Sequence, residues 1–214
     1  MWEFITERRV DIAYNAFQHA NLVGQSVLIA TVLAVALAVL VTRVRRLEPV
    51  ANALSAIGLT LPSFALVGLL MPVTGLGAGT AVLCVVFYAT LPVLRNAVVG
   101  LQGVDEVLLE SGRGMGMSEV RTLLQVRLPL AWPVILAGIR TSTQMTMGIA
   151  AIAAYVLGPG LGGYIFTGLA QSGAENALRY ALVGTVGIVL IAILADLALL
   201  ALGRLTIPKG IRAA

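Results

Sequence analysis

Charged side chains are scarce in this sequence of 214 residues. They make up 11% of it, against about 25% in an ordinary soluble domain, whereas 59% of the residues are hydrophobic. A soluble fold cannot cover its surface with so few polar groups, and a disordered chain needs low hydrophobicity and a high net charge. The composition therefore excludes both classes and indicates an integral membrane protein.

Reactive side chains are scarcer still, with one histidine, one cysteine and one lysine in the sequence. His19 and Cys84 cannot supply the three or four ligands of a zinc site, and a single cysteine forms no internal disulfide. Lys209 follows Pro208, so it does not belong to a G-x-x-x-x-G-K-[ST] nucleotide-binding loop. We therefore expect no metal or cofactor on this chain, and any ATP hydrolysis must occur on another polypeptide.

Five apolar stretches are long enough to cross a membrane, since each holds the roughly 20 residues that a spanning helix needs. Unbroken apolar runs such as 27–41 are not the alternating segments of a β-barrel. The sequence thus predicts an all-α membrane protein with about five transmembrane helices, near residues 20–42, 50–71, 76–98, 131–157 and 180–203.

Arginines set the predicted orientation. Arg43, Arg45 and Arg46 follow the first stretch, and the positive-inside rule then places the N-terminus outside and the C-terminus inside. Arginines in cytoplasmic loops account for the net charge of +4, so the charge does not require that the protein binds nucleic acid. No cleavage site follows the first stretch, so we expect a retained helix. The predicted divisions are an extracytoplasmic segment 1–19 (with an amphipathic surface helix over 3–19), a transmembrane domain 20–206 and a cytoplasmic tail 207–214.

The segment 105–129, DEVLLESGRGMGMSEVRTLLQVRLP, is too polar to span a membrane, yet its apolar residues recur at helical spacing. Ser118 can cap a second helix, which Pro129 is expected to end. The pattern predicts a helix–turn–helix with an apolar face that needs a partner. Glycines are expected to separate its halves: Gly112, Gly114 and Gly116.

The order Glu110-Ser111-Gly112, three residues, Gly116, nine residues, Val126-Arg127-Leu128-Pro129 resembles the EAA loop of ABC importer permeases. That pattern reads Glu-Ala-Ala, three residues, Gly, nine residues, Ile-x-Leu-Pro. The sequence departs from it by small or conservative changes at positions 111, 112 and 126. The resemblance implies that the loop contacts an ATPase subunit through Glu110, Ser111, Gly112, Gly116, Met117, Val126, Leu128 and Pro129.

Further segments are similar to the glycine betaine/choline/carnitine branch of these permeases: 60–63, 91–96, 114–117, 137–141 and 206–210. The resemblance implies a type I importer fold in a bacterial or archaeal cytoplasmic membrane. It also implies two ATP-binding subunits that hold ATP and Mg, a second permease (identical or homologous) and an extracytoplasmic substrate-binding protein. The alternatives are a permease for another small polar solute such as an amino acid, and a secondary carrier. A carrier would show inverted repeats and several membrane carboxylates.

Polar residues within two stretches are candidates for the translocation path: Pro62, Ser63, Thr141, Ser142, Gln144 and Thr146. Lipid cannot satisfy such groups, so they face other helices or water. Small residues also recur at every fourth position from Gly138 to Ala154, which permits close helix packing. The sequence does not decide whether this stripe lines the translocation path or packs against another helix. Pro62 either marks a binding site or only kinks its helix.

Two charges lie inside the predicted spans. Arg140 and Asp196 each fall roughly 12–14 Å from the inner interface at about 1.5 Å per residue, where a lone charge is costly. Similar depth and opposite sign predict an ion pair, and the alternative is that Arg140 extends towards the interface near Trp132.

Two remaining features carry no predicted chemistry. Residues 158–163 match G-x-G-x-x-G, but they follow a membrane helix instead of a strand, so we expect a loop that re-enters or caps the outer mouth. His19 is interpreted as an interfacial residue near the outer end of the first span.

Overall fold

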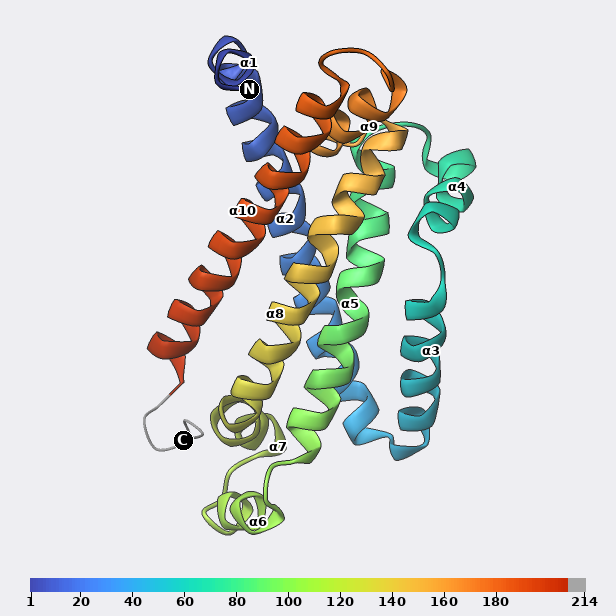
Figure 1. The fold of residues 1–214 in the computed structure, drawn as a ribbon. Coiled ribbons are helices and arrows are strands. Elements are labelled where there is room, and N and C mark those ends of the chain that lie inside the picture. The colour runs from blue at the N-terminus through green and yellow to red at the C-terminus, as the bar shows by residue number, and fades with distance from the viewer. Residues whose placement is uncertain (208–214) are drawn as a thin grey trace.

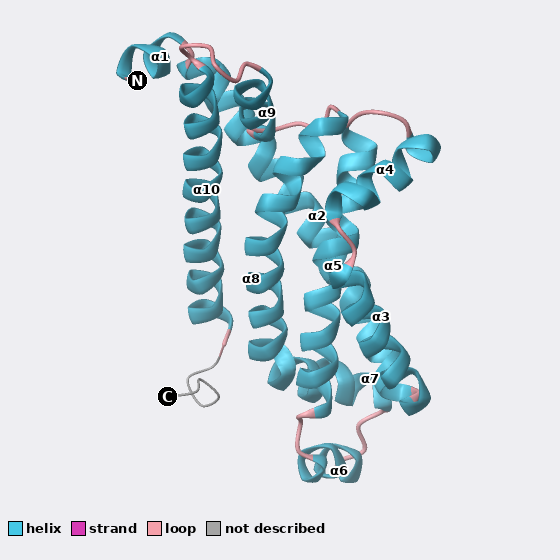
Figure 2. Cartoon of the chain, turned by 45° about the vertical axis from the view of Figure 1, so that its right-hand side comes forward, coloured by secondary structure: helices cyan, strands magenta, loops and turns pink. Residues whose placement is uncertain are grey.

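The computed structural model describes residues 1–207, and every regular element in that range is a helix (Figures 1 and 2). Four helical segments are long and apolar enough to cross a membrane: α2 (Arg9–Arg43), α5 (Ala78–Gln102), the segment Glu119–Val156 around α8 (Leu128–Ala153), and α10 (Ala177–Thr206). A fifth is formed by the bent pair α3 (Glu48–Thr60) and α4 (Ser63–Thr74). The predicted all-α membrane fold is confirmed.

The second predicted span is broken, with 97° between α3 and α4. Leu61 and Pro62 are both extended there (ψ 127° and 128°), because a proline offers no N–H and disfavours helical geometry in the residue before it. The hydroxyl of Tyr88 on α5 donates a hydrogen bond of 2.5 Å to the Leu61 carbonyl. This bond satisfies a backbone group that the break would leave unpaired in the membrane.

Helix α5 is the centre of the bundle, with α2, α8 and the α3–α4 pair packed around it (Figure 1). The small-residue stripe of α8 makes the close approach to α5, since a β-carbon added at Gly138 would lie 2.6 Å from Cβ of Asn96. Ser142 donates its hydroxyl hydrogen to the Ala89 carbonyl of α5 at 2.8 Å. Small side chains therefore let α8 approach α5 closely enough for a side-chain hydroxyl to reach a backbone carbonyl.

The N-terminal segment differs from the prediction of one surface helix over 3–19. Helix α1 (Trp2–Glu7) ends at Arg8, and residues 9–19 already belong to the long α2. Arg8 fixes the junction, because its guanidinium carbon lies 4.5 Å from the Phe4 ring centroid and its Nε donates to the Tyr180 hydroxyl at 3.2 Å. Only α1 is separate from the long helix, and its buried Phe4 packs against the ring of Tyr180 on α10.

His19 is fully buried, so its interpretation as an interfacial residue is wrong. Its Nε2 lies 3.2 Å from the Met147 carbonyl of α8. Gly160, at a φ of +121°, passes so close that an added β-carbon would lie 2.7 Å from Nδ1 of His19. The glycine-rich loop folds back over α2, and this covering could not be read from the helical pattern alone.

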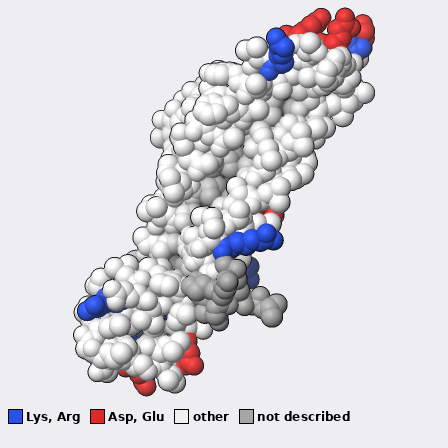
Figure 3. Space-filling view, turned by 90° about the vertical axis from the view of Figure 1, so that its left-hand side faces the viewer, with Lys and Arg blue, Asp and Glu red and all other residues white. Residues whose placement is uncertain are grey.

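The two ends of the bundle carry different short helices (Figures 1 and 2). Helix α1 and α9 (Gly162–Ala170) lie at one end, and α6 (Glu106–Gly114) with α7 (Glu119–Thr122) lies at the other. Short turns η1 (Arg45–Leu47), η2 (Leu123–Arg127) and η3 (Ala154–Val156) join the longer elements. Charged side chains gather towards both ends of the face in Figure 3, with a broad uncharged surface between them. The predicted tail from 208 onwards lies outside the described residues.

Candidate functional site

The segment 105–129, called here the EAA-like loop, projects from one end of the bundle as two helices. Asp105 caps α6 by accepting the Val107 N–H at 2.9 Å, and Ser118 caps α7 by accepting the Arg121 N–H at 3.4 Å. Caps of this type satisfy backbone donors that have no partner within the helix. The sequence fixes both helix starts by these two side chains.

The turn between the halves is shorter than predicted. Gly112 and Gly114 lie inside α6, and among the three glycines only Gly116 occupies the turn, at a φ of +80° that favours glycine. An alanine at Gly112 would make only ordinary contacts, because an added β-carbon lies 3.5 Å from Sδ of Met117. The position would therefore accept an alanine, and Gly112 is helical despite its weak intrinsic preference.

Pro129 does not end the second helix, contrary to the prediction. Helix α7 continues through the π-helical turn η2 into α8, and Pro129 lies in the first turn of α8. A proline is tolerated there because the wider turn leaves its missing N–H without consequence. The EAA-like loop is consequently joined to α8 by unbroken helix.

Apolar side chains and several carboxylates, Glu110 among them, are exposed on the EAA-like loop. Within the described chain, Glu110 is exposed and makes no ion pair or hydrogen bond through its side chain. The exposed apolar side chains surround it in the sequence: Val107, Leu108, Met115, Val120 and Leu124. Exposed apolar clusters of this kind mark contact surfaces for other proteins.

The other residues that resemble the family pattern divide between surface and interior. Ser111, Gly116 and Pro129 are exposed, Gly112 is buried, and three are half-buried: Met117, Val126 and Leu128. The exposed members are available for contact. The covered members hold α6 against α7 and the start of α8.

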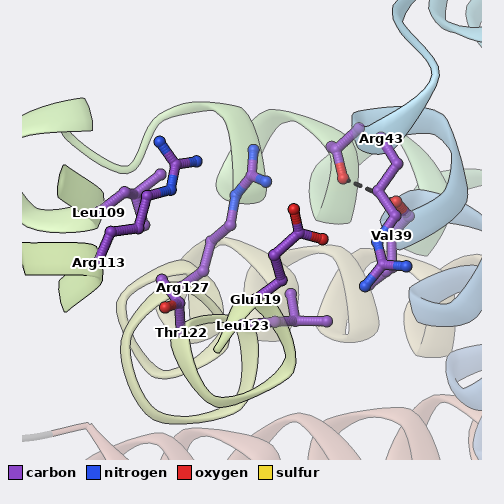
Figure 4. Close-up of a pocket in the computed structure, with 9 residues that line it drawn as sticks. Val39, Arg43, Leu109, Arg113, Glu119, Thr122, Leu123 and Arg127 are labelled. Atoms are coloured by element: carbon purple, nitrogen blue, oxygen red, sulfur yellow. Dashed lines mark hydrogen bonds between the residues drawn. The ribbon is translucent and has the colours of Figure 1, made fainter. Parts of the chain in front are cut away.

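A charged cavity of about 160 Å³ lies behind the loop and was missed by the sequence analysis (Figure 4). Arg43 at the end of α2 lines one side, and Arg113, Glu119 and Arg127 line the other. Arg127 also donates from Nε to the Leu101 carbonyl at 2.8 Å, which ties η2 to the end of α5. The open space between α2 and the loop leaves that side of the loop unpacked. The cavity forms where α2, α6 and α7 with η2 come together in space, so the sequence alone could not predict it.

The candidate path residues do not share one face. Ser142 and Thr146 are buried and donate to backbone carbonyls at 2.8 Å, Ser142 to Ala89 and Thr146 to Ser142. Thr141 and Gln144 are exposed on another face of α8. Pro62 is exposed and Ser63 half-buried at the α3–α4 break. The structure therefore gives α8 a packing face and a separate exposed face.

The exposed face of α8 is a stripe of small or polar residues within the membrane-crossing part of the chain: Ala137, Thr141, Gln144 and Gly148. An added β-carbon at Gly148 would meet nothing within 4 Å. Thr141 donates its hydroxyl hydrogen to the Ala137 carbonyl at 3.1 Å, whereas the exposed Gln144 amide can make further hydrogen bonds that lipid does not offer. The stripe is thus suited to face another subunit or an aqueous path.

Arg140 and Asp196 lie together between α8 and α10. Arg140 donates from Nε to Oδ1 at 2.9 Å and from Nη2 to Oδ2 at 3.0 Å of the carboxylate. Such paired bonds combine charge with fixed geometry. Gln144 lies close to the same carboxylate. The guanidinium is directed across to α10 instead of along α8 towards Trp132, whose Nε1 donates to Thr206 at 2.7 Å.

No group of three or more His, Cys, Asp or Glu side chains is arranged to hold a metal ion within the described residues. The described residues instead form an exposed loop, a continuous helix behind it, a broken span and a polar stripe.

Residues 22–207 match the family described as binding-protein-dependent transport system inner membrane component. The choline transport system permease protein OpuBB of Bacillus subtilis is 36% identical over 98% of this chain and 95% of its own length. The osmoprotectant import permease protein OsmW of Salmonella typhimurium is 38% identical, with 94% of each chain covered.

Solved structures share the fold at low identity. A chain of the MetNI methionine ABC transporter in an inward-facing conformation superposes with a TM-score of 0.78 at 20% identity, covering 91% of this chain and 95% of that one. A chain of an amino acid ABC transporter with histidines gives a TM-score of 0.70 at 17% identity, with 96% of each chain covered. These likenesses establish the arrangement of the helices.

Proposed function

Because the chain belongs to the family of binding-protein-dependent transport system inner membrane components, we propose that it is the permease subunit of an ATP-driven importer of quaternary-ammonium osmoprotectants. The family makes it a multi-pass component of the inner membrane. The substrate class (glycine betaine, choline, carnitine or a similar compound) rests on relatives that cover nearly the whole chain.

Energy would enter through the EAA-like loop. Glu110 and the apolar side chains beside it offer a contact for an ATP-binding subunit, which would hold ATP and Mg. Unbroken helix from α7 through η2 into α8 would carry the movement into the membrane. The cavity beside Arg43 leaves the loop free of α2 on that side, so the movement need not disrupt a packed core.

Substrate would pass between two permease subunits, identical or homologous. The exposed stripe of α8 supports this proposal, because its small side chains permit close packing and the Gln144 amide can make further hydrogen bonds that lipid does not offer. Closure of the ATPases would bring two EAA-like loops together and open the path towards the binding protein, and hydrolysis would open it inward. Pro62 would serve as the hinge of the broken span, with α3 and α4 changing their mutual angle.

Selectivity would lie mainly in the extracytoplasmic binding protein. A quaternary ammonium group is recognised by several aromatic rings arranged around it, and aromatic residues form only 6% of this sequence. The permease would then accept what the binding protein delivers. The polar stripe of the permease itself carries hydroxyl, amide and glycine groups, which would discriminate little between small polar substrates.

The substrate is tested with the complete importer reconstituted in vesicles, by ATPase activity in the presence of its binding protein. We expect glycine betaine, choline or carnitine to stimulate hydrolysis, and methionine or histidine to leave it at the basal rate. Stimulation by an amino acid alone would overturn the substrate proposal and favour the other permease class. Uptake by this chain alone that stops with an uncoupler would instead favour a secondary carrier.

The ATPase contact is tested by co-purification. Glu110→Arg is expected to release the ATP-binding subunit, because it reverses the charge of an exposed carboxylate on the proposed contact loop. Glu3→Arg is the matched control, since Glu3 is also an exposed helical glutamate but lies at the opposite end of the bundle. Retention of the ATPase by Glu110→Arg would refute the contact.

A further inference from the structure

The guanidinium of Arg140 has unused hydrogen-bond donors in the membrane-crossing part of α8. An arginine side chain carries five N–H groups, and Arg140 donates from Nε and Nη2 to Asp196, at 2.9 Å and 3.0 Å. Within the described residues, the other three N–H groups have no partner. Because lipid tails offer no acceptor, these groups need water or a ligand.

The ion pair can be reached from outside the subunit. The Arg140 side chain is 33% exposed and the Asp196 side chain 21% exposed. Since Asp196 holds the guanidinium at this depth, its unused donors cannot extend to the membrane interface. They remain available to a molecule that passes beside α8.

The ion pair borders the exposed stripe of α8. Gln144, a member of that stripe, lies one helical turn from Arg140 and about 40° around the helix axis, at about 100° per residue. Its amide is also close to the Asp196 carboxylate. The unused donors therefore lie beside the surface that is proposed above to face a second permease and the path.

A carboxylate is the group that these donors fit best. It accepts two parallel N–H bonds from the edge of a guanidinium, and the charges make such bonds stronger than neutral ones. Asp196 is the only acidic residue inside the five predicted spans. An identical second permease would thus bring no unpaired carboxylate to this depth, so the carboxylate would come from a molecule that enters the path.

An ion pair also matches a neutral zwitterion. Glycine betaine and carnitine carry a carboxylate together with a quaternary ammonium group, whereas choline has no carboxylate. The ammonium group has no N–H and is attracted to an anion by charge alone, so it can lie against Asp196, whose oxygens keep unused lone pairs. Such a pairing adds no net charge to the site, and a lone charge is costly within the membrane.

We propose that the free edge of Arg140 binds the carboxylate of a zwitterionic cargo during its passage, with the quaternary ammonium group beside Asp196. This inference rests on the proposed function. It gives the permease a preference of its own for glycine betaine or carnitine over choline, while the binding protein remains the main filter. Arg140 then both holds α8 to α10 and contacts the cargo.

The first test needs no variant. Binding of radiolabelled compounds to the membrane complex of permease and ATPase subunits is measured by equilibrium dialysis in detergent, without the separate binding protein. We expect glycine betaine to bind at least about tenfold more tightly than its amide, which keeps the quaternary ammonium group but has no carboxylate. Choline should bind as weakly as the amide. Equal binding of glycine betaine and its amide, or no saturable binding of glycine betaine, overturns the proposal.

The second test uses Arg140→Lys, which removes the free edge but keeps a positive charge that can pair with Asp196. This variant should bind glycine betaine at least about tenfold more weakly than the wild type, with the binding of choline and of the amide unchanged. Arg46→Lys is the matched control, because Arg46 is exposed and lies outside the predicted spans; it should bind all three compounds as the wild type does. An equal loss for the three compounds in Arg140→Lys would make Arg140 a structural residue only and would overturn the proposal.

The ATPase activity of the complete importer separates this inference from the proposed function. If glycine betaine, choline or carnitine stimulates hydrolysis while the binding assay shows no preference for a carboxylate, the Arg140 site alone is refuted. If none of these compounds stimulates hydrolysis, the proposed function is refuted as well.

Discussion

Gly138 is the position where the packing of α8 on α5 is tested most directly. In Gly138→Ala the new β-carbon would lie 2.6 Å from Cβ of Asn96 and 3.1 Å from the Pro92 carbonyl oxygen. Carbon atoms pack at about 3.5–4.0 Å, so the helices must separate by about 1 Å. The atoms that collide belong to or adjoin the backbone of α5, and rotation of a side chain cannot relieve the contact.

The cost follows from two effects. A separation of about 1 Å forfeits up to half of each local dispersion contact, and overpacking of this kind costs about 1–3 kcal/mol. It also stretches the 2.8 Å bond from Ser142 to Ala89 beyond hydrogen-bonding range, which costs about 0.5–1.5 kcal/mol. Alanine returns up to about 1 kcal/mol through helix propensity. The expected net loss is about 1–3 kcal/mol.

The assay is reversible unfolding of the purified chain in mixed micelles, followed by circular dichroism. Gly148→Ala is the matched control on the same helix, because its β-carbon meets nothing within 4 Å; it should be neutral or slightly stabilising. Ser142→Ala should lose less in the Gly138→Ala background than alone, since the same bond is already broken. Equal stability of Gly138→Ala and wild type, or additive losses with Ser142→Ala, would refute the packing argument.

Three further predictions concern single contacts. Arg140→Gln and Asp196→Asn should each destabilise the chain in the same unfolding assay, with a less than additive loss in the double variant; additive losses would contradict pairing. Tyr88→Phe should cost about 1–3 kcal/mol, since it leaves the carbonyl at the α3–α4 break unpaired in the membrane, and wild-type stability would show that another donor reaches it. Tyr164 donates to a carboxylate of α2, and burial with this bond raises the pKa of its hydroxyl. The unfolded chain would then lose this proton first, so the stability that Tyr164 contributes should be fully present just below pH about 10 and should be lost above it; Tyr164→Phe should remove this alkaline decrease, and its persistence would assign it to another group.

The sequence predicted the spans well because apolar length is a local property. About twenty consecutive apolar residues require a membrane, whatever their neighbours are. The same holds for the caps at Asp105 and Ser118, where one side chain decides where a helix begins. Local signals failed at Pro129, because a π-helical turn accommodates the proline, and at residues 9–19, which extend α2 instead of lying apart.

Part of the candidate site could be predicted from the sequence for the same reason. The order of residues from Glu110 to Pro129 could be compared with a known pattern directly. The four-residue spacing of small side chains on α8 could not decide between path lining and packing, since spacing gives a face but not what covers it. The structure turns Ser142 towards α5 and exposes Gln144. His19 was misjudged because its cover comes from residues more than a hundred positions away.

The sequence by itself determined that this is a multi-pass membrane protein, which apolar stretches are long enough to span, which loop resembles a known contact element, and that it has no nucleotide-binding loop of its own. These conclusions depend on composition and on order along the chain. Only the tertiary structure decided which face of α8 meets α5, that the broken span bends by 97°, and that a charged cavity lies behind the EAA-like loop. The physical reason is that helix formation and membrane insertion follow from neighbouring residues, whereas packing faces, ion-pair geometry and cavities arise where distant segments meet.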